Sequence, residues 1–201
     1  MSDNITIDAY DKYAQNYDDS VAYFWDNFPT DFVDKFADAA PGKRVLDAGS
    51  GSGRDALLLR DHGFDVMCQD GSRAMVDMTN DLGFESHHTS FADMDFAPQS
   101  FDAIWAYTSL IHIPPDEARQ VIQTLRSYLR PDGVFAIGMI EGDSAGMVDH
   151  KSMPGSPRYF KRYTSDELKR LLEPLGLDLI HEQKYQPHNS VYINQLYKKF
   201  S

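Results

Sequence analysis

The sequence predicts an α/β fold in which parallel strands are covered by helices on both faces. From Val45 onward, short apolar runs alternate with longer segments of helical periodicity. Such alternation is typical of parallel strands joined by right-handed crossovers. The last two apolar runs are joined only by the short polar connection "QPHN", which predicts a closing hairpin and therefore at least one antiparallel pair.

The expected elements follow one another along the chain. Local signals bound several of them: Ser72 is a candidate N-cap, Gly63 and Gly83 end two helices, and Thr164 with Glu167 forms a capping box. In order, the predicted elements are a strand at 44–49, a helix at 54–63, a strand at 65–70, a helix at 72–83, strands at 84–90 and 101–108, a helix at 114–133, a strand at 134–140, a helix at 164–176, and strands at 177–185 and 190–200.

The first forty residues have a different character, because they mix aromatic residues with aspartates. Apolar residues at helical spacing predict a helix over 29–39. Tyr10, Tyr13 and Tyr17 are spaced three and four apart, which places them on one stripe of a helix. This stripe either packs against the rest of the domain or forms a lid over a ligand site, where a tyrosine offers both an aromatic body and a polar tip.

The composition favours a small-molecule partner. The net charge is −12, from 19 basic and 31 acidic residues, so we expect neither a nucleic-acid nor a membrane partner. No apolar run reaches the ~18 residues that span a bilayer, and the N-terminus lacks the features of a secretory signal. We therefore expect a cytoplasmic protein, a monomer or a homodimer, in which the single cysteine, Cys68, is a buried free thiol.

The stretch "VLDAGSGSGRD", residues 45–55, follows the first predicted strand and so lies at the carboxyl edge of the sheet, where such folds bind ligands. Gly49, Gly51 and Gly53 allow a tight turn and a close approach of a ligand to the backbone. A dinucleotide-binding G-x-G-x-x-G loop counted from Gly49 needs a glycine at position 54, which is Arg54, and the G-K-[ST] ending of a phosphate-binding loop is absent. The loop therefore argues against a phosphate site.

Three carboxylates at strand ends indicate a different ligand. Asp47 precedes the glycines, where it repels phosphate and suits a cationic or donor-rich group. Asp70 ends the second strand and can accept hydrogen bonds from both hydroxyls of a ribose, and Asp93, after the third strand, can accept from an exocyclic amine. The ligand inferred has a ribose, an amine-bearing base and a positive group, although each carboxylate alone could equally cap a helix.

The segment 45–76 resembles the nucleotide-binding half of the class I S-adenosylmethionine-dependent methyltransferases. The family's acidic-x-G-x-G-x-G loop is matched by Asp47 and the three glycines, and its D-x-S-x-x-M segment by Asp70, Ser72 and Met75. "ADMDFAPQSFDAIWAYTSLIHI" is similar to its third and fourth motifs, and "LRSYLRPDGVFAI" to its L-x-P-G-G segment. There Asp132 replaces the first glycine, which we expect only to alter a turn.

The resemblance, which covers about residues 40–140, implies a Rossmann-like three-layer sandwich. Its sheet would be mostly parallel and seven-stranded, with an antiparallel C-terminal strand. It also implies a single methyltransferase domain over residues 1–201, in which 1–40 form an N-terminal helical cap or lid. Residues 41–201 would form the core, with an insert at 141–163 whose length is typical of a lid or binding loop.

The resemblance further implies S-adenosyl-L-methionine as the cofactor. Asp47 and the loop of Gly49, Ser50, Gly51 and Gly53 would face its methionine portion, and Arg54 would approach its carboxylate. Asp70 would hold the ribose hydroxyls. The other implied contacts are Gly71 or Ser72 and Met75 beside the adenine, Asp93 and the Met94 N–H at the adenine edge, Tyr107 near the methyl group, and Tyr10, Tyr13 or Tyr17 closing over the cofactor.

The acceptor side is expected to come from segments around the fourth strand, the N-terminus and the insert. His112 in "SLIHIPP" is a candidate general base beside the methyl group, with Tyr107 as a second catalytic candidate, although a histidine there can equally tie its loop to the backbone. Candidate acceptor contacts are Tyr23, Trp25, Arg158 and Phe160. An arginine in the insert can bind an anionic or aromatic substrate, or pair with surface acids. No His/Cys/Asp spacing predicts a metal site.

Taken together, the sequence predicts S-adenosylmethionine-dependent methyl transfer to a small-molecule acceptor. A nicotinamide-dependent oxidoreductase is one alternative, and Gly53 and Asp47 argue against it. A regulatory protein that binds the cofactor without turnover is another, because a fold alone does not define a reaction.

Overall fold

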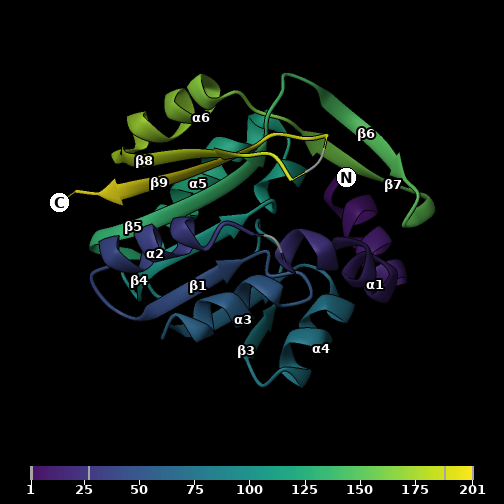
Figure 1. Ribbon diagram of the computed structural model, residues 1–201, viewed down its shortest axis with the longest axis horizontal. Helices are drawn as coiled ribbons and strands as arrows, with labels where there is room; N and C mark the ends of the chain where they lie inside the picture. The colour runs from purple at the N-terminus through teal and green to yellow at the C-terminus, as the bar shows by residue number, and fades with distance from the viewer. Residues whose placement is uncertain (1, 27, 188, 201) are drawn as a thin grey trace.

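A seven-stranded sheet forms the middle layer of the molecule, in the order β3-β2-β1-β4-β5-β9-β8 (Figure 1). The strands from β3 to β5 pair in parallel, and β9 is antiparallel to both of its neighbours, so the predicted fold class is confirmed. This computed structural model describes residues 2–26, 28–187 and 189–200. The strands of the sheet are β1 Arg44–Ala48, β2 Asp65–Asp70, β3 Glu85–His88, β4 Phe101–Tyr107, β5 Leu129–Ile140, β8 Leu177–Tyr185 and β9 Tyr192–Lys199.

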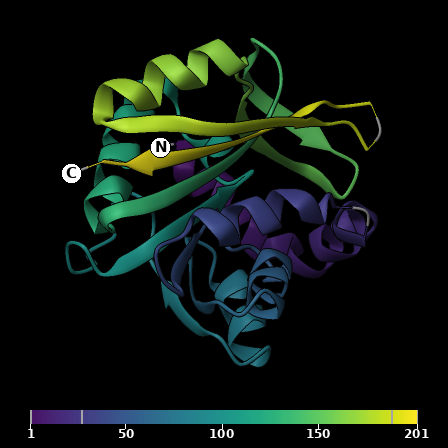
Figure 2. The ribbon, with the colours of Figure 1, turned by 60° about the vertical axis from the view of Figure 1, so that its left-hand side comes forward.

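Helices cover both faces of the sheet (Figures 1 and 2). On one face Phe36 of α2 and Leu59 of α3 share a core with Trp105, and on the other Leu125 of α5 and Leu172 of α6 share a second core. The helices are α1 Ser2–Asp26, α2 Thr30–Ala39, α3 Arg54–Asp61, α4 Arg73–Asp81, α5 Pro115–Tyr128 and α6 Ser165–Leu172. Within the described residues, no helix is long and apolar enough to cross a membrane.

Strand β4 shows why the sheet carries helices on both sides. Every residue of β4 is buried. Ala103 and Trp105 point into the core that contains α2 and α3, and Ile104 and Ala106 point into the core that contains α5 and α6. Because successive side chains of a strand face opposite ways, a strand covered on both sides reads as a continuous apolar run.

The local signals act as predicted. Ser72 caps α4 by accepting a hydrogen bond from Met75 N, and Thr164 and Glu167 form both bonds of the capping box at the start of α6. Strand β5 begins at Leu129, before the predicted start at 134, because its first residues already pair with β4. Asp132 takes a left-handed φ of 63° there, which Asp adopts more readily than most residues.

The 141–163 insert is a hairpin, whereas the sequence predicted a long loop. β6 (Ala145–His150) and β7 (Met153–Lys161) pair antiparallel beside α1 (Figures 1 and 2). The glycines and prolines of this segment interrupt the alternating pattern by which strands are predicted from sequence. The hairpin packs against α1 through β7. Thr6 Oγ1 accepts from Tyr159 N at 3.1 Å, and the Tyr13 hydroxyl donates to Pro154 O at 3.0 Å. α1 itself is kinked at Tyr13, where φ is −126° and ψ is 28°.

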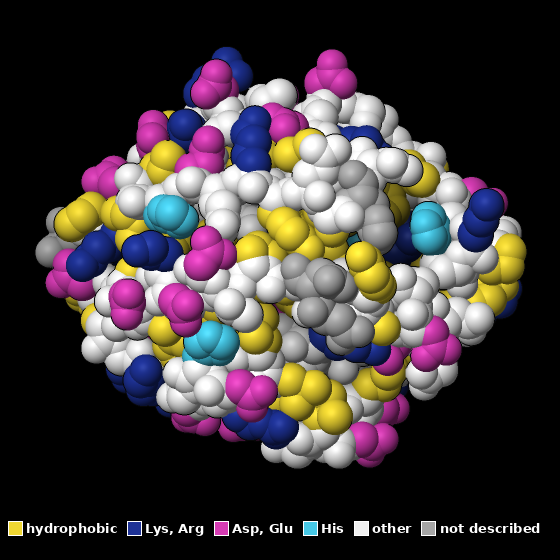
Figure 3. Space-filling model, viewed as in Figure 1, with side chains coloured by type: hydrophobic (Ala, Val, Ile, Leu, Met, Phe, Trp, Pro, Cys, Tyr) yellow, Lys and Arg dark blue, Asp and Glu magenta, His cyan; other side chains and the backbone are white. Residues whose placement is uncertain are grey.

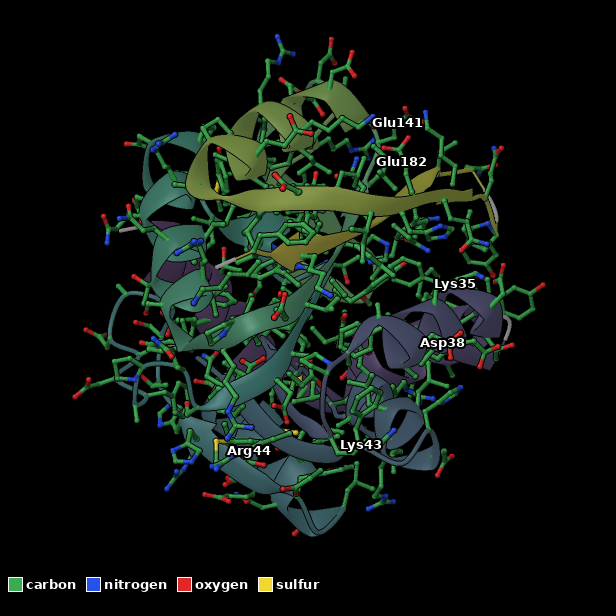
Figure 4. All side chains as sticks on the ribbon, turned by 90° about the vertical axis from the view of Figure 1, so that its left-hand side faces the viewer. Lys35, Asp38, Lys43, Arg44, Glu141 and Glu182 are labelled. Carbon is green, nitrogen blue, oxygen red and sulfur yellow. The ribbon has the colours of Figure 1, made fainter. Side chains whose placement is uncertain are left out.

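The two ends of the parallel strands have different surroundings. The starts of the strands lie at the end marked by Lys43 and Arg44 (Figure 4), where Arg130 Nη1 pairs with Asp102 Oδ1 at 2.6 Å. The carboxyl ends of β1, β2 and β4 lie at the other end, under α1. A ligand site is expected at that second end, because parallel sheets bind ligands beyond the carboxyl ends of their strands.

Candidate functional site

A cavity, partly open to solvent, lies between α1 and the loops that follow β1, β2, β3 and β4. From α1 it is lined by Thr6, Ile7, Tyr10, Tyr17, Val21 and Trp25. From the rest of the chain it is lined by Gly49, Ser50, Gly51, Ser52, Arg54, Asp55, Asp70, Gly71, Met75, Ser90, Phe91, Tyr107, Thr108, Ser109, His112 and Ile113. Polar groups and aromatic rings together form its wall, as in most small-molecule sites.

The glycine loop is bonded to the end of β2. Gly49 N and Ser50 N both donate to Gln69 O, at 2.8 and 2.9 Å, and Gly51 N donates to Asp70 Oδ2 at 2.9 Å. These three N–H groups are therefore already used within the protein, and a phosphate site needs them free. Gly49 is required for packing, because its φ is 77° and a Cβ there would lie 2.3 Å from Ser109 Cβ.

Asp47 and Asp55 are two buried acidic residues at the floor of the cavity. Asp47 is 1 % exposed, and neither of its oxygens has a hydrogen-bond partner among the described residues. Burial raises the pKa of Asp47 well above its usual range, and the nearby Asp55 and Asp70 raise it further. Burial also raises the pKa of Asp55 to about 8, although Trp105 Nε1, which donates to Asp55 Oδ2 at 2.9 Å, opposes this shift.

Asp70 lines the cavity at the end of β2. Its Oδ2 accepts from Gly51 N, and its Oδ1 accepts from Ser72 N at 2.8 Å. A carboxylate has about four lone-pair sites, so Asp70 can still accept from a ligand. Burial raises the pKa of Asp70 and the nearby Asp11 raises it further, while backbone hydrogen bonds from Ser72, Gly51 and Gly71 lower it. The three carboxylates together form a site that a cationic, donor-rich ligand would stabilise.

Tyr107, at the end of β4, presents its ring to the cavity. Its hydroxyl donates to Asn194 Oδ1 at 2.7 Å, and its ring stacks on Trp105 with 5.7 Å between centroids. The neighbouring strand makes room for it, because a Cβ on Gly138 would lie 2.3 Å from the Tyr107 ring. Burial raises the pKa of the Tyr107 hydroxyl well above its usual range. Tyr107 therefore offers an aromatic surface and stays protonated.

A chain of hydrogen bonds links Arg158, Tyr10 and His112 at another part of the wall. Arg158 Nη1 donates to the Tyr10 oxygen at 2.7 Å, and the Tyr10 hydroxyl lies 2.8 Å from His112 Nε2. His112 Nδ1 lies 2.6 Å from Tyr159 O, which can only accept, so Nδ1 carries the proton and Nε2 accepts from Tyr10. Burial lowers the pKa of His112 to about 4, so this histidine is neutral at pH 7.

α1 is fastened over the cavity by acidic side chains. Arg54 forms a bidentate pair with Asp18, with 2.6 Å between Nε and Oδ1 and 2.9 Å between Nη2 and Oδ2. Asp11 Oδ1 accepts from Ser72 Oγ at 2.6 Å and from Ala74 N at 3.0 Å, at the N-terminus of α4. A carboxylate there also interacts favourably with the helix dipole. The N-terminal segment is thus a roof of the site, which supports the lid interpretation of its tyrosine stripe.

The structure brings many of the predicted site residues to one cavity. Those that line it are Gly49, Ser50, Gly51, Arg54, Asp70, Gly71, Met75, Tyr107, His112, Tyr10, Tyr17 and Trp25. Asp47 lies beneath the loop, and Gly53, with φ of 86°, is the N-cap of α3. Ser72 uses its hydroxyl to cap α4 and to contact Asp11.

Other predicted residues lie outside the lining. The Tyr13 hydroxyl donates to Pro154 O in the hairpin. Tyr23 is 56% exposed and does not line the cavity. Phe160 packs on the His112 ring, with 4.7 Å between centroids, and Arg158 lies behind Tyr10. These positions remove Tyr13 and Tyr23 from the candidate ligand contacts.

The structure places neither Asp93 nor Met94, the residues predicted at the adenine edge, among those that line the cavity. The Asp93 carboxylate is exposed and accepts from Ser90 Oγ at 2.6 Å, and Met94 is buried in the core, with its carbonyl accepting from the Tyr128 hydroxyl. Asp93 N donates back to Ser90 O, which closes a turn after β3. Ser90 and Phe91 therefore take the places on the cavity wall that were assigned to Asp93 and Met94.

Sequence reasoning also missed several lining residues. Asp55 ends the segment 45–55 but was given no role, although an acid in the first turn of a helix next to a ligand loop is a usable signal. Thr108 and Ser109 directly follow β4, the same position that singled out Tyr107. Thr6 and Ile7 carried no signal, because only the fold of α1 brings them to the site.

The chain is similar in sequence to known methyltransferases. Residues 17–182 match the family model described as a methyltransferase domain. The "Methyltransferase GfsG" of Streptomyces halstedii is 31% identical over 158 residues, which cover 71% of this chain. The tRNA 5-carboxymethoxyuridine methyltransferase of Escherichia coli (strain K12) is 28% identical over 148 residues, which cover 69% of this chain. The matched regions span 55% of the length of each of these two relatives.

A solved structure shows the same fold. It is the Burkholderia thailandensis 1,6-didemethyltoxoflavin-N1-methyltransferase with bound 1,6-didemethyltoxoflavin and S-adenosylhomocysteine. It aligns with a TM-score of 0.68 over 94% of this chain and 88% of its own, at 22% identity.

Proposed function

The chain belongs to the class I S-adenosylmethionine-dependent methyltransferases, and we propose that it binds S-adenosylmethionine and transfers the methyl group to a small-molecule acceptor. The observation that carries this proposal is the group of three carboxylates at the ends of β1 and β2 and the start of α3. Asp47 in particular is buried with both oxygens unpaired among the described residues. A ligand with a positive sulfur and an ammonium group would complement this charge.

The cavity also suits the uncharged parts of the cofactor. Asp70 has free lone pairs for the ribose hydroxyls, and Met75 and Phe91 offer apolar surfaces for the adenine. Ser90 replaces Asp93 as the residue we assign to the adenine edge. Arg54 remains the candidate for the cofactor carboxylate, in exchange for part of its pairing with Asp18.

For methyl transfer, the main task of the protein is to position the cofactor and the acceptor. S-adenosylmethionine, when bound, supplies a methyl group on a positively charged sulfur. Tyr107, Trp25 and Tyr17 surround the remaining space with aromatic surface, and α1 shields it from water. Holding two reactants at near-attack distance can supply roughly 7–11 kcal/mol. His112 Nε2 is occupied by the Tyr10 hydroxyl, so we do not retain His112 as a general base.

Two observations favour a small molecule over a nucleic acid as the acceptor. The cavity lies under α1, and the chain carries a net charge of −12. On the face shown in Figure 3, Lys and Arg side chains are interspersed with Asp and Glu side chains. Affinity for nucleic acids depends on clustered basic residues that neutralise phosphates. We therefore do not carry over the tRNA substrate of the Escherichia coli relative.

Calorimetry and a transfer assay test the proposal in sequence. We expect S-adenosylmethionine and S-adenosylhomocysteine to bind and NADH not to bind. Binding of NADH alone would contradict the proposal. Transfer of labelled methyl groups to a member of a metabolite panel separates an enzyme from a regulatory protein, because the latter binds the cofactor and leaves every acceptor unlabelled.

A further inference from the structure

Arg158 is a buried cation without a counter-charge. Its side chain belongs to β7 and is 5 % exposed. It forms no salt bridge with any carboxylate in the described parts of the chain, and its Nε has no hydrogen-bond partner there. Burying an unpaired charge is costly, so such a group indicates that a negative partner is supplied from elsewhere.

Aromatic rings hold the guanidinium in place. Its Cζ lies 5.0 Å from the ring centroids of Tyr10 and Phe160 and 5.9 Å from that of Tyr17. Cation–π contacts offset part of the burial cost and fix the position of the charge. They do not neutralise it, so the positive field persists at the wall of the cavity.

Tyr10 connects this charge to the cavity. Tyr10 and His112 line the cavity, and Arg158 lies directly behind Tyr10. Arg158 can only donate, so it occupies a lone pair of the Tyr10 oxygen and leaves the hydroxyl hydrogen free to rotate between His112 Nε2 and a ligand. Because His112 donates its own Nδ1 proton to Tyr159 O, this group of three residues carries one positive charge, and its one acceptor, His112 Nε2, is occupied as long as Tyr10 donates to it.

We propose that Arg158, Tyr10 and His112 form a subsite for an oxyanion of the methyl acceptor, either a carboxylate or a phosphoryl group. The proposal rests on the proposed function and narrows it to acidic acceptors. Tyr10 donates to the oxyanion, and Arg158 is a positioning residue that acts through Tyr10. An acceptor that arrives as an anion has no proton to lose before it attacks, so its methylation requires no general base.

The cavity wall then presents groups of both charge signs. Asp55 and Asp70 line it, and Arg158 stands behind Tyr10. A cationic cofactor and an anionic acceptor are each drawn to the part that complements them. The competing occupant of the Arg158 subsite is the carboxylate of the cofactor itself, and the test below separates the two.

Three probes test the subsite in the complex of the protein with S-adenosylhomocysteine. Calorimetry measures binding of benzoate and phenylphosphonate, which distinguish a carboxylate from a phosphoryl group, and of benzamide as the neutral counterpart. We expect at least one anionic probe to bind more tightly than benzamide. Arg158→Gln should weaken that probe about tenfold or more and leave the affinity for S-adenosylhomocysteine unchanged, with partial rescue in Arg158→Lys.

Two further variants make the result decisive. Arg162→Gln removes an exposed positive charge from the same segment and should leave probe binding unchanged. Tyr10→Phe keeps the ring and Arg158, and should weaken the anionic probe even where Arg158→Gln fails to fold.

Three outcomes overturn the subsite. They are equal binding of anionic and neutral probes, probe binding that survives both Arg158→Gln and Tyr10→Phe, and loss of S-adenosylhomocysteine affinity in Arg158→Gln. The last outcome would assign Arg158 to the cofactor carboxylate. Failure of the wild-type protein to bind S-adenosylhomocysteine would instead contradict the proposed function itself.

Discussion

At the scale of single residues, the buried carboxylates near the glycine loop depend on what surrounds them. Asp47 is shielded from water without a partner among the described residues, and Asp55 keeps one bond, from Trp105. Both have raised pKa values, chiefly through burial. In the ligand-free protein these acids therefore hold protons at a pH where exposed aspartates are ionised.

Ligand binding should release some of these protons. At pH 7, a positively charged ligand beside the cluster favours the ionised carboxylates and lowers their pKa values. We expect the calorimetric enthalpy of S-adenosylmethionine binding to depend on the ionisation enthalpy of the buffer, with net proton release. S-adenosylhomocysteine lacks the sulfonium charge and should release fewer protons. Equal enthalpies in phosphate and Tris buffers would contradict this prediction.

The pH dependence of stability gives a second test. In the unfolded chain the pKa of an Asp is about 3.9, and in the folded protein burial raises the pKa of Asp55 to about 8. The folded state thus binds more protons in this range, so the contribution of Asp55 to stability is present below about pH 4 and is lost as pH rises through about 8. Asp55→Asn keeps an oxygen that can accept from Trp105 and removes the titration.

We therefore expect the free energy of unfolding of Asp55→Asn to fall less steeply between pH 4 and 8 than that of the wild-type protein. At pH 8 the variant should be more stable by about 1–3 kcal/mol. Denaturant titrations across this pH range measure the difference. Asp61→Asn, at the exposed end of the same helix, is the matched control, and parallel curves for Asp55→Asn and wild type would refute the assignment.

Asp70 carries a third prediction. Asp70→Ala should weaken binding of S-adenosylmethionine by about 1.5–3 kcal/mol, because it removes the acceptor for the ribose and frees the N–H groups of Gly51 and Ser72. Calorimetry provides the affinity. Asp93→Ala removes an equivalent charge outside the cavity and should leave affinity unchanged. An effect of Asp93→Ala as large as that of Asp70→Ala would restore the original assignment of Asp93.

At the scale of elements, α1 is held to the core by contacts near its ends and middle. Thr6 and Tyr13 contact the hairpin, Asp11 contacts α4, and Asp18 pairs with Arg54. The pair of Arg54 and Asp18 is largely shielded, with side chains 26% and 18% exposed. α1 can therefore open only by breaking several polar contacts together, which couples the roof to ligand entry.

Removing one of these contacts should loosen α1 without unfolding the core. We expect Asp18→Ala to increase hydrogen exchange over residues 2–26 and to weaken S-adenosylhomocysteine binding about three- to tenfold, consistent with loss of a hydrogen bond to a charged group. Exchange in β4 and β5 should not change. Asp19→Ala, on the same helix, breaks only a local bond from Gln15 and should behave as wild type. Uniformly faster exchange across the sheet would show that α1 is part of the core instead of a roof.

At the scale of the whole molecule, the sequence predicts the central fold more completely than the site. The segment from β1 to α5 has apolar runs and caps whose signals are local, so the strand at 65–70 and the Ser72 cap are found where predicted. The 145–161 hairpin was missed because its strands gain support from α1, far away in sequence. The position of Asp93 outside the cavity could not be read from the sequence, because it follows from the turn after β3, in which Asp93 N donates to Ser90 O.

The candidate site depends even more than the fold on contacts between residues that are far apart in sequence. Asp47 and Asp70 could be assigned because each stands at a fixed offset from a strand end. The group of Arg158, Tyr10 and His112 could not, because it joins residues separated by 148 and 102 positions in the chain. No local pattern reports such a contact, and only the packing of α1 against the hairpin creates it.

The cavity wall is built from segments that differ in how tightly they are bonded to the sheet, so mutations in them affect acceptor selectivity and folding differently. The cofactor half is built from the loops after β1 and β2, which are also bonded into the sheet, so substitutions there endanger folding. Much of the rest comes from α1, which lies outside the central layers and packs against the β6–β7 hairpin. These two segments can accumulate mutations as a pair while the core stays constant. Duplicated copies of such a gene can thus acquire new acceptors by exchanging α1 and the hairpin together.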